Sequence, residues 1–152
     1  MRRFSVSFSA VAVTAQVDFF EVVAGTNNPI EITGLSLGQS TDAGDSEAEQ
    51  AYIELVRGYT TSGAGGASAT PVALDSGAAS NATAETNNTT LASTGTPVIP
   101  FTTGFNLQAG LDWNPTPEQY VRVAGGERLV VRLGGAPADS VSFSGTLFYI
   151  EH

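Results

Sequence analysis

The sequence contains no cysteine and no lysine, and its single histidine is His152. Without cysteine, the chain forms neither disulfides nor zinc–thiolate sites. Without lysine or an internal histidine, Ser-His-Asp, Cys-His and Schiff-base mechanisms lack a base or nucleophile, and a GxxxxGK[ST] phosphate loop is impossible. No run reaches the ~18 apolar residues of a membrane-spanning helix. These absences favour a non-enzymatic protein without a cofactor, so we predict neither catalytic nor metal-binding residues.

Positive charge is also scarce. Six arginines oppose fifteen acidic residues, which gives the chain a formal net charge of −9. So acidic a protein does not neutralise phosphates, and we predict that it binds neither nucleic acid nor anionic membranes. The acidity keeps the surface soluble; the alternative is a partner that is positively charged or rich in metal ions.

Some of the acidic residues invite a chemical interpretation. Four crowd one polar loop: Asp42, Asp45, Glu47 and Glu49. Hard cations prefer such oxygen ligands, but the EF-hand pattern is not met, so we expect a solvated loop and keep cation binding as the alternative. Four others lie in or beside predicted strands: Glu21, Glu31, Glu54 and Glu127. Paired carboxylates hydrolyse glycosides, but charges on exposed strand faces explain these positions equally well.

The sequence is rich in alternating apolar and polar positions, the pattern of half-buried β-strands. The pattern is strongest over residues 127–151, where two runs flank the turn GGAPADS. Residues 3–14 follow Met1-Arg2-Arg3 and imitate an export signal, but their strict alternation favours a strand. Further strands are predicted over residues 17–23, 30–37, 51–59, 105–111 and 120–123. About eight strands in one domain, residues 1–152, predict an all-β sandwich, and eight strands fit a jelly roll.

Residues 60–97 differ in composition from the rest of the chain. They contain no aromatic residue, only Asp75 and Glu85 as charges, and many small or polar side chains. Such a segment buries too little apolar surface to order itself alone. We therefore expect a long low-complexity loop, or an extended arm that is ordered by lying on another subunit, with one strand available from Thr86 to Ser93.

Four aromatic residues are the candidates for an interface: Phe19, Phe20, Trp113 and Tyr120. Neighbouring residues of a regular strand point to opposite faces, so one of Phe19 and Phe20 should be in the core and the other exposed or covered by a partner. Trp113 begins the proline-rich stretch WNPTP. The alternative is that these aromatics fill the core or pack under that loop. The last strand becomes apolar on both faces, which indicates cover from the sandwich or a neighbouring subunit.

Several segments spread along the chain carry a resemblance to a known family: the alternating strand at Met1, DFFEV, PIEITGLSLGQSTDAGD, RGYTTSGAGG, WNPTPE and APADSVSFSGTLFYIE. In these segments the chain resembles small virion structural proteins of tailed bacteriophages, of the head decoration (cement) type. The resemblance implies a sandwich or jelly-roll domain in the virion that binds the major capsid protein or other virion proteins, forms a homotrimer and reinforces the head. It carries over no functional residue. Two alternatives stay open: a tail or neck component, and a carbohydrate- or receptor-binding module with Trp113 and Tyr120 as an aromatic platform.

Overall fold

The computed structural model describes residues 1–41 and 49–152. Within these ranges the chain is almost wholly β-strand, and its helical structure is η1, a single 3-10 turn at Pro117–Gln119. No helix in the described ranges has the length and apolarity to cross a membrane. Sheet A contains β1 (Arg2–Val13), β3 (Ile30–Gln39), β6 (Val72–Ala73), β9 (Leu111–Trp113), β10 (Val121–Val123) and β12 (Val141–Glu151). Sheet B contains β2 (Asp18–Val23), β4 (Gln50–Thr61), β5 (Ala67–Ala69), β7 (Thr83–Asn88), β8 (Ser93–Asn106) and β11 (Arg128–Leu133).

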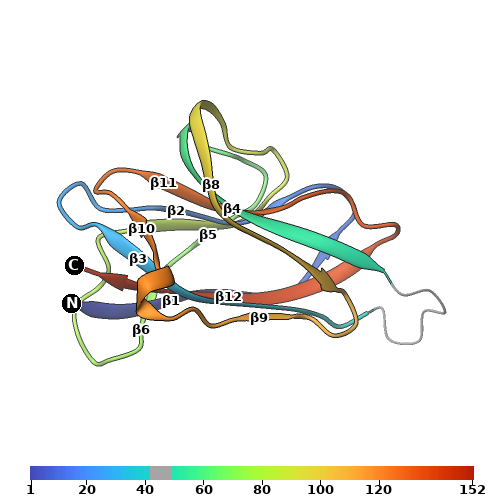
Figure 1. Cartoon of the computed structure of the whole chain (residues 1–152), viewed down its shortest axis with the longest axis horizontal. Coiled ribbons are helices and arrows are strands. Elements are labelled where there is room, and N and C mark those ends of the chain that lie inside the picture. The colour runs from blue at the N-terminus through green and yellow to red at the C-terminus, as the bar shows by residue number, and fades with distance from the viewer. Residues whose placement is uncertain (42–48) are drawn as a thin grey trace.

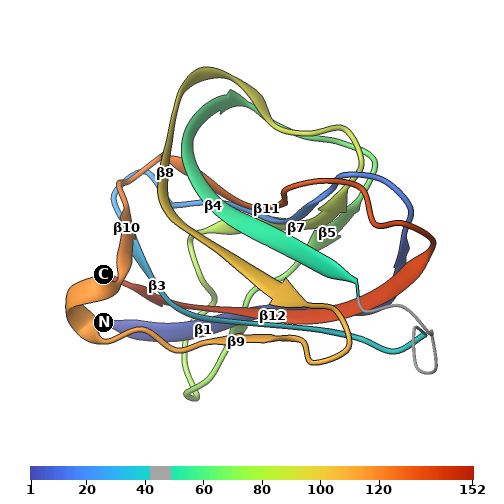
Figure 2. The ribbon, with the colours of Figure 1, turned by 45° about the vertical axis from the view of Figure 1, so that its right-hand side comes forward.

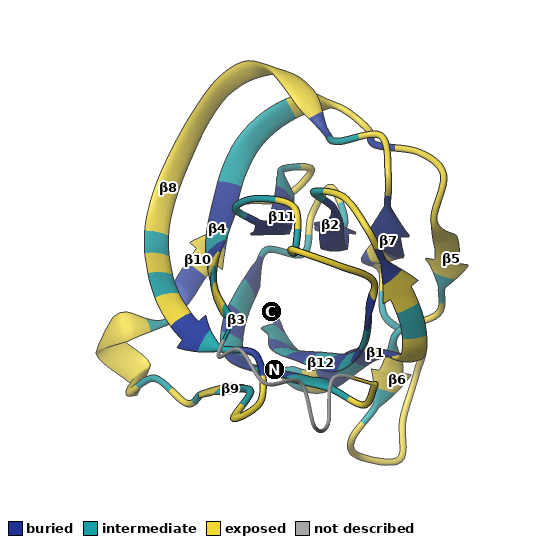
Figure 3. Cartoon of the chain, turned by 90° about the vertical axis from the view of Figure 1, so that its right-hand side faces the viewer, coloured by how far each residue is buried: buried dark blue, intermediate teal, exposed yellow. Residues whose placement is uncertain are grey.

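The two antiparallel sheets lie face to face and enclose one main hydrophobic core, which is clearest in the end-on view of Figure 3. Every second residue of β12 from Val141 to Tyr149 is buried, as the alternation predicted. Leu129, Val131 and Leu133 of β11 are buried in the same core from the opposite sheet. The predicted all-β sandwich is therefore confirmed.

The order of the strands is compatible with a jelly roll. The chain changes sheet at β1–β2, β2–β3, β3–β4, β5–β6, β6–β7, β8–β9, β10–β11 and β11–β12. Eight of the strands run β10–β3–β12–β1 in sheet A and β2–β11–β4–β8 in sheet B, with β9 also paired to β3. Such alternation between two sheets is how eight strands form two Greek keys. The structure has more strands than the eight or so expected. Three of them, β5, β6 and β7, lie in the low-complexity segment between β4 and β8, and β9 and β10 are two separate strands.

The predicted opposite orientation of Phe19 and Phe20 is wrong. Both side chains have no exposed surface and lie in the main core. The pairing of β2 with β11 skips Phe19, since Val131 pairs with Phe20 and Arg132 with Asp18. A β-bulge of this kind breaks the alternation and turns two consecutive side chains to one face.

The predicted strand over residues 105–111 is also wrong. β8 ends at Asn106, and the chain turns and enters sheet A as β9. The Asn106 carbonyl accepts a hydrogen bond from the Gly110 amide (3.0 Å), and the Asn106 side chain accepts one from the Gln108 amide (2.9 Å). Gly110 has φ of +77°, which favours glycine over any other residue. The alternation of apolar and polar residues continues by chance through a turn, after which the chain passes from sheet B to sheet A.

The low-complexity segment packs against the rest of its own chain. Between the end of β4 and the start of β8, β5 and β7 extend sheet B beyond β2, while β6 extends sheet A beyond β1 (Figure 1). Ala82 and Ala84 reach the main core, and Thr86, Asn87 and Asn88 are buried as well. We call residues 62–92 the wrapping segment, because it passes along the β1 and β2 side of the sandwich.

Candidate functional site

A buried ion pair holds the end of the wrapping segment. Asp18 of β2 is completely buried, and Arg132 of β11 donates to both its oxygens, from Nε at 2.6 Å and from Nη2 at 3.0 Å. The Ala92 amide donates to Asp18 Oδ2 (2.8 Å), and Arg132 Nη2 also donates to the Ala92 carbonyl (2.8 Å). The Arg132 guanidinium lies 4.7 Å from the centre of the Tyr59 ring. The pair thus fixes residue 92 just before β8 begins.

Glu21 holds the beginning of the same segment. Its carboxylate accepts hydrogen bonds from Arg128 Nε (2.6 Å), Ser62 Oγ (2.7 Å), the Gly63 amide (2.9 Å) and Asn88 Nδ2 (3.1 Å). Burial by itself raises the pKa of Glu21, but the hydrogen bonds from Ser62, Gly63 and Arg128, with the arginine charge, lower its pKa below the ordinary value. The carboxylate is therefore ionised and fully engaged.

Glu151 holds the middle of the wrapping segment. This buried carboxylate pairs with Arg2 at 2.5 Å and accepts hydrogen bonds from Ser80 Oγ (3.0 Å) and the Asn81 amide (2.7 Å). Ser80 Oγ also lies 2.8 Å from Tyr149 Oη. Burial is the main cause that raises the pKa of Tyr149 to about 12, so its hydroxyl stays protonated.

The sequence analysis missed this role of the acidic residues. We expected Glu21 on an exposed strand face, but it is 2% exposed, whereas Glu31, Glu54 and Glu127 are half-buried. Buried charges need paired, hydrogen-bonded partners. Here Asp18, Glu21 and Glu151 meet that need by binding the wrapping segment, which therefore orders through polar contacts although it has little apolar surface. The sequence signal that could have indicated this role is the segment RLVVR, whose two arginines can pair with acidic residues of a neighbouring strand.

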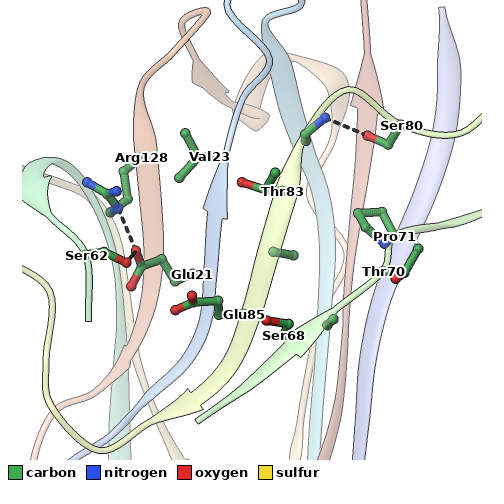
Figure 4. A pocket seen from close by; sticks show the side chains of 13 residues that line it. Glu21, Val23, Ser62, Ser68, Thr70, Pro71, Ser80, Thr83, Glu85 and Arg128 are labelled. Carbon is green, nitrogen blue, oxygen red and sulfur yellow. Dashed lines mark hydrogen bonds and ion pairs between the residues drawn. The ribbon is translucent and has the colours of Figure 1, made fainter. Parts of the chain in front are cut away.

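A groove lies beside these contacts, over β2, β5 and β7, with a volume of about 440 Å³ (Figure 4). Glu21 and Glu85 are paired residues of β2 and β7, and Ser68 pairs with Glu85 from β5. Asn88 Nδ2 bridges the two carboxylates, at 2.7 Å from Glu85 Oε2. The Glu21 carboxylate already accepts four hydrogen bonds from its own chain. The groove is better explained as the seam of the wrapping segment.

The role of Glu21 can be tested by amide exchange. We expect Glu21→Gln to lower the protection factor of the Gly63 amide about 10- to 100-fold at neutral pH, because a hydrogen bond to a charged group contributes roughly 1.5–3 kcal/mol. Since the folded pKa of Glu21 is lowered, its contribution is present above the unfolded pKa of about 4.3 and is lost as the pH falls through the folded pKa. The protection of wild-type Gly63 should fall in that acidic range.

Hydrogen exchange resolved by NMR measures both effects. Glu85→Gln is the matched control, because Glu85 accepts a hydrogen bond from Asn88 and none from Gly63. If Gly63 keeps its protection in Glu21→Gln, the carboxylate does not hold the segment.

A second candidate site is an apolar cleft between the free edges of the two sheets. Trp113 of β9 stacks on Phe101 of β8 with ring centres 4.5 Å apart, and these rings line a cavity of about 290 Å³ with Pro100, Gln119 and Val121. Trp113 is half-buried, so it bridges sheet A to sheet B and does not stand free as a platform. Tyr120 is also half-buried, follows η1 and does not line the cleft.

Beside the cleft runs β8, the terminal strand of sheet B in the described ranges. Its fourteen residues carry no charge, and Ser93 to Pro100 are all exposed, with Val98 and Ile99 at 47% and 51%. With β4 it curves away from the rest of the sheet (Figure 2). Pro97 and Pro100 lack N–H groups, which limits pairing with a further strand. The strand therefore offers side chains to a partner more than backbone hydrogen bonds.

The four predicted interface residues do not form one site: Trp113 lines the cleft, whereas Phe19 and Phe20 lie in the core and offer no surface. The described residues contain no cluster of three or more histidine, cysteine, aspartate or glutamate side chains suited to a metal ion. Of the predicted acidic loop, Asp42, Asp45 and Glu47 lie outside the described residues, and Glu49 Oε1 accepts a hydrogen bond from the Ala138 amide (2.5 Å). Comparison with protein-family models, curated proteins and solved structures finds no match.

Proposed function

We propose that the protein is a non-enzymatic virion structural protein of the capsid decoration type, which binds the major capsid protein through β8 and the adjoining cleft and reinforces the phage head. The resemblance of its segments to such proteins supports this function. The fold class supports it too, since jelly rolls are used in viral capsids and lectins, although a fold alone does not decide function.

The observation that carries the proposal is the absence of charge on β8. In a chain of net charge −9, fourteen consecutive residues of an outer strand have no ionisable side chain, and Val98 and Ile99 are about half exposed. Natural proteins usually protect long edge strands with charges. We infer that this strand is uncharged because a partner covers it.

The ion pairs of the fold support a structural role. Four of the six arginines pair with carboxylates of the same chain: Arg2, Arg3, Arg128 and Arg132. Three of these carboxylates bind the wrapping segment. This use of charge rigidifies the domain and leaves little positive surface for nucleic acid. A rigid β-domain with an apolar outer strand suits a protein that bridges subunits of a shell.

The test is the binding of purified protein to phage heads that lack it, measured by co-sedimentation. We expect Ile99→Glu to weaken binding at least tenfold, because burying an unpaired charge in an apolar contact costs more than the 1.4 kcal/mol that a tenfold change represents. Thr26→Glu adds the same charge in an exposed turn and should bind like the wild type. Equal binding by both variants would exclude β8 as the docking surface, and no binding by the wild type would count against a decoration role.

The carbohydrate-binding alternative has weaker support. Sugars stack on exposed aromatic faces, and Trp113 already stacks on Phe101 while Tyr120 lies outside the cleft. A tail or neck component has the same chemistry as a decoration protein and differs in its place in the virion. The preference for isolated heads over isolated tails in the co-sedimentation experiment separates these two.

A further inference from the structure

The outer face of sheet A changes character near the chain termini. Over most of the sheet this face carries small polar residues, such as Ser7, Thr146 and Ser36, which are neighbours in register. Closer to the termini, one row across four strands reads Arg3, Ile150, Glu31 and Arg122. We call these four residues the arginine row. Figure 1 shows both termini at this end of the sandwich.

The arginine row contains both exposed arginines of the chain. Arg3 and Arg122 are exposed, whereas the other four arginines are half-buried or buried. Arg3 pairs with Asp75 at 2.8 Å, and both side chains are more than half exposed. The Arg122 guanidinium makes no hydrogen bond or ion pair with any described residue. An arginine presents five donors in a rigid fork that matches a carboxylate, so Arg122 is open to an acidic partner.

Apolar side chains lie at the centre and edge of this row. Ile150 and its neighbour Phe148, which pairs with Ser5 in the adjacent row, are half-buried on the outer face. Val72 pairs with Ser5 from β6 and is 63% exposed, and Leu74, bound through its amide to the Arg3 carbonyl, is 52% exposed. Aromatic, aliphatic and arginine side chains around a small apolar centre are typical of protein interfaces.

We propose that this outer face binds a second copy of the chain, with Arg122 facing a carboxylate of that copy. Charge complementarity favours a second copy as the partner: the chain has a net charge of −9, four of its other arginines are already paired within it, and Arg57 is half-buried. The surface of a second copy away from this face is therefore acidic, and such potentials steer association. The inference goes beyond the proposed function, which assigns the capsid contact to β8.

Light scattering of the free protein over a range of concentrations tests the proposal. We expect the wild type to be larger than a monomer, and both Arg122→Gln and Ile150→Glu to weaken self-association at least tenfold. Each change makes the net charge more negative by one. Ala136→Glu makes the same change on an exposed loop of the β11–β12 connection and should associate like the wild type. Circular dichroism checks that each variant is folded.

Two outcomes would overturn the inference. If the wild type is oligomeric and both variants keep its mass, the copies meet through another surface, and the proposed function stands. If the wild type is a monomer at all concentrations, the chain does not self-associate through this face. Binding to phage heads then still tests the proposed function separately, because that experiment probes β8 on the opposite sheet.

Discussion

Replacing Arg132 by methionine is expected to lower the free energy of unfolding by about 3–5 kcal/mol, because it leaves the Asp18 carboxylate buried without its partner. Asp18 has no exposed surface, and both its oxygens accept hydrogen bonds from Arg132. The same change removes the bond from Arg132 to the Ala92 carbonyl and its contact with the Tyr59 ring. Urea unfolding, followed by circular dichroism, measures the loss.

The matched control is Arg3→Met. Arg3 also pairs with an aspartate, but both side chains are more than half exposed, and ion pairs in water contribute little. We expect its unfolding midpoint to equal that of the wild type within error. The double variant Asp18→Asn, Arg132→Met should regain part of the lost stability, because it removes the unpaired charge. A loss below about 1 kcal/mol for Arg132→Met would mean that water or a rearranged donor satisfies Asp18.

The second large effect is expected for Phe19→Ala, which should lower the free energy of unfolding by about 3–5 kcal/mol through the cavity that it leaves. The Phe19 ring lies 5.9 Å from Phe8 and 5.0 Å from Phe143, between centroids, and has no exposed surface. Urea unfolding again measures the change. Ile99→Ala, on the exposed strand β8, should leave the stability nearly unchanged.

This pair of variants also separates a core role from an interface role. If Phe19→Ala keeps the stability of the wild type but no longer binds phage heads, Phe19 serves a partner and the packing described above is wrong. If it loses stability while Ile99→Glu loses binding, the core and the docking surface are distinct. The structure leads us to expect the second result.

The alternation of side chains located most of the strands. β1, β2, β3, β4, β10, β11 and β12 all fall within or close to the predicted ranges. The period of two is a local property of an extended chain, so it can be read without knowing the partners of a strand.

The interface candidates were harder to predict. The sequence identified Trp113, which lines the cleft, and it contains the uncharged stretch 93–106, but only the fold shows that this stretch is an exposed strand at the edge of sheet B. It also could not reveal the arginine row, because Arg3, Ile150, Glu31 and Arg122 come from four strands far apart in the chain. A surface of this kind forms only when these strands pair side by side in the folded sheet.

By itself, the sequence determined which side chains this protein lacks, its net negative charge, and an all-β architecture, because composition and a period of two do not depend on folding partners. The tertiary structure decided which faces became core. A bulge turned both Phe19 and Phe20 inward, and a turn at Gly110 moved the chain from one sheet to the other. It also ordered residues 62–92. The apolar content of this segment is too low to order it alone, but three buried carboxylates accept hydrogen bonds from it. Those contacts join residues 42 to 74 positions apart, and hydrogen bonds over such separations form only where the fold brings their atoms together.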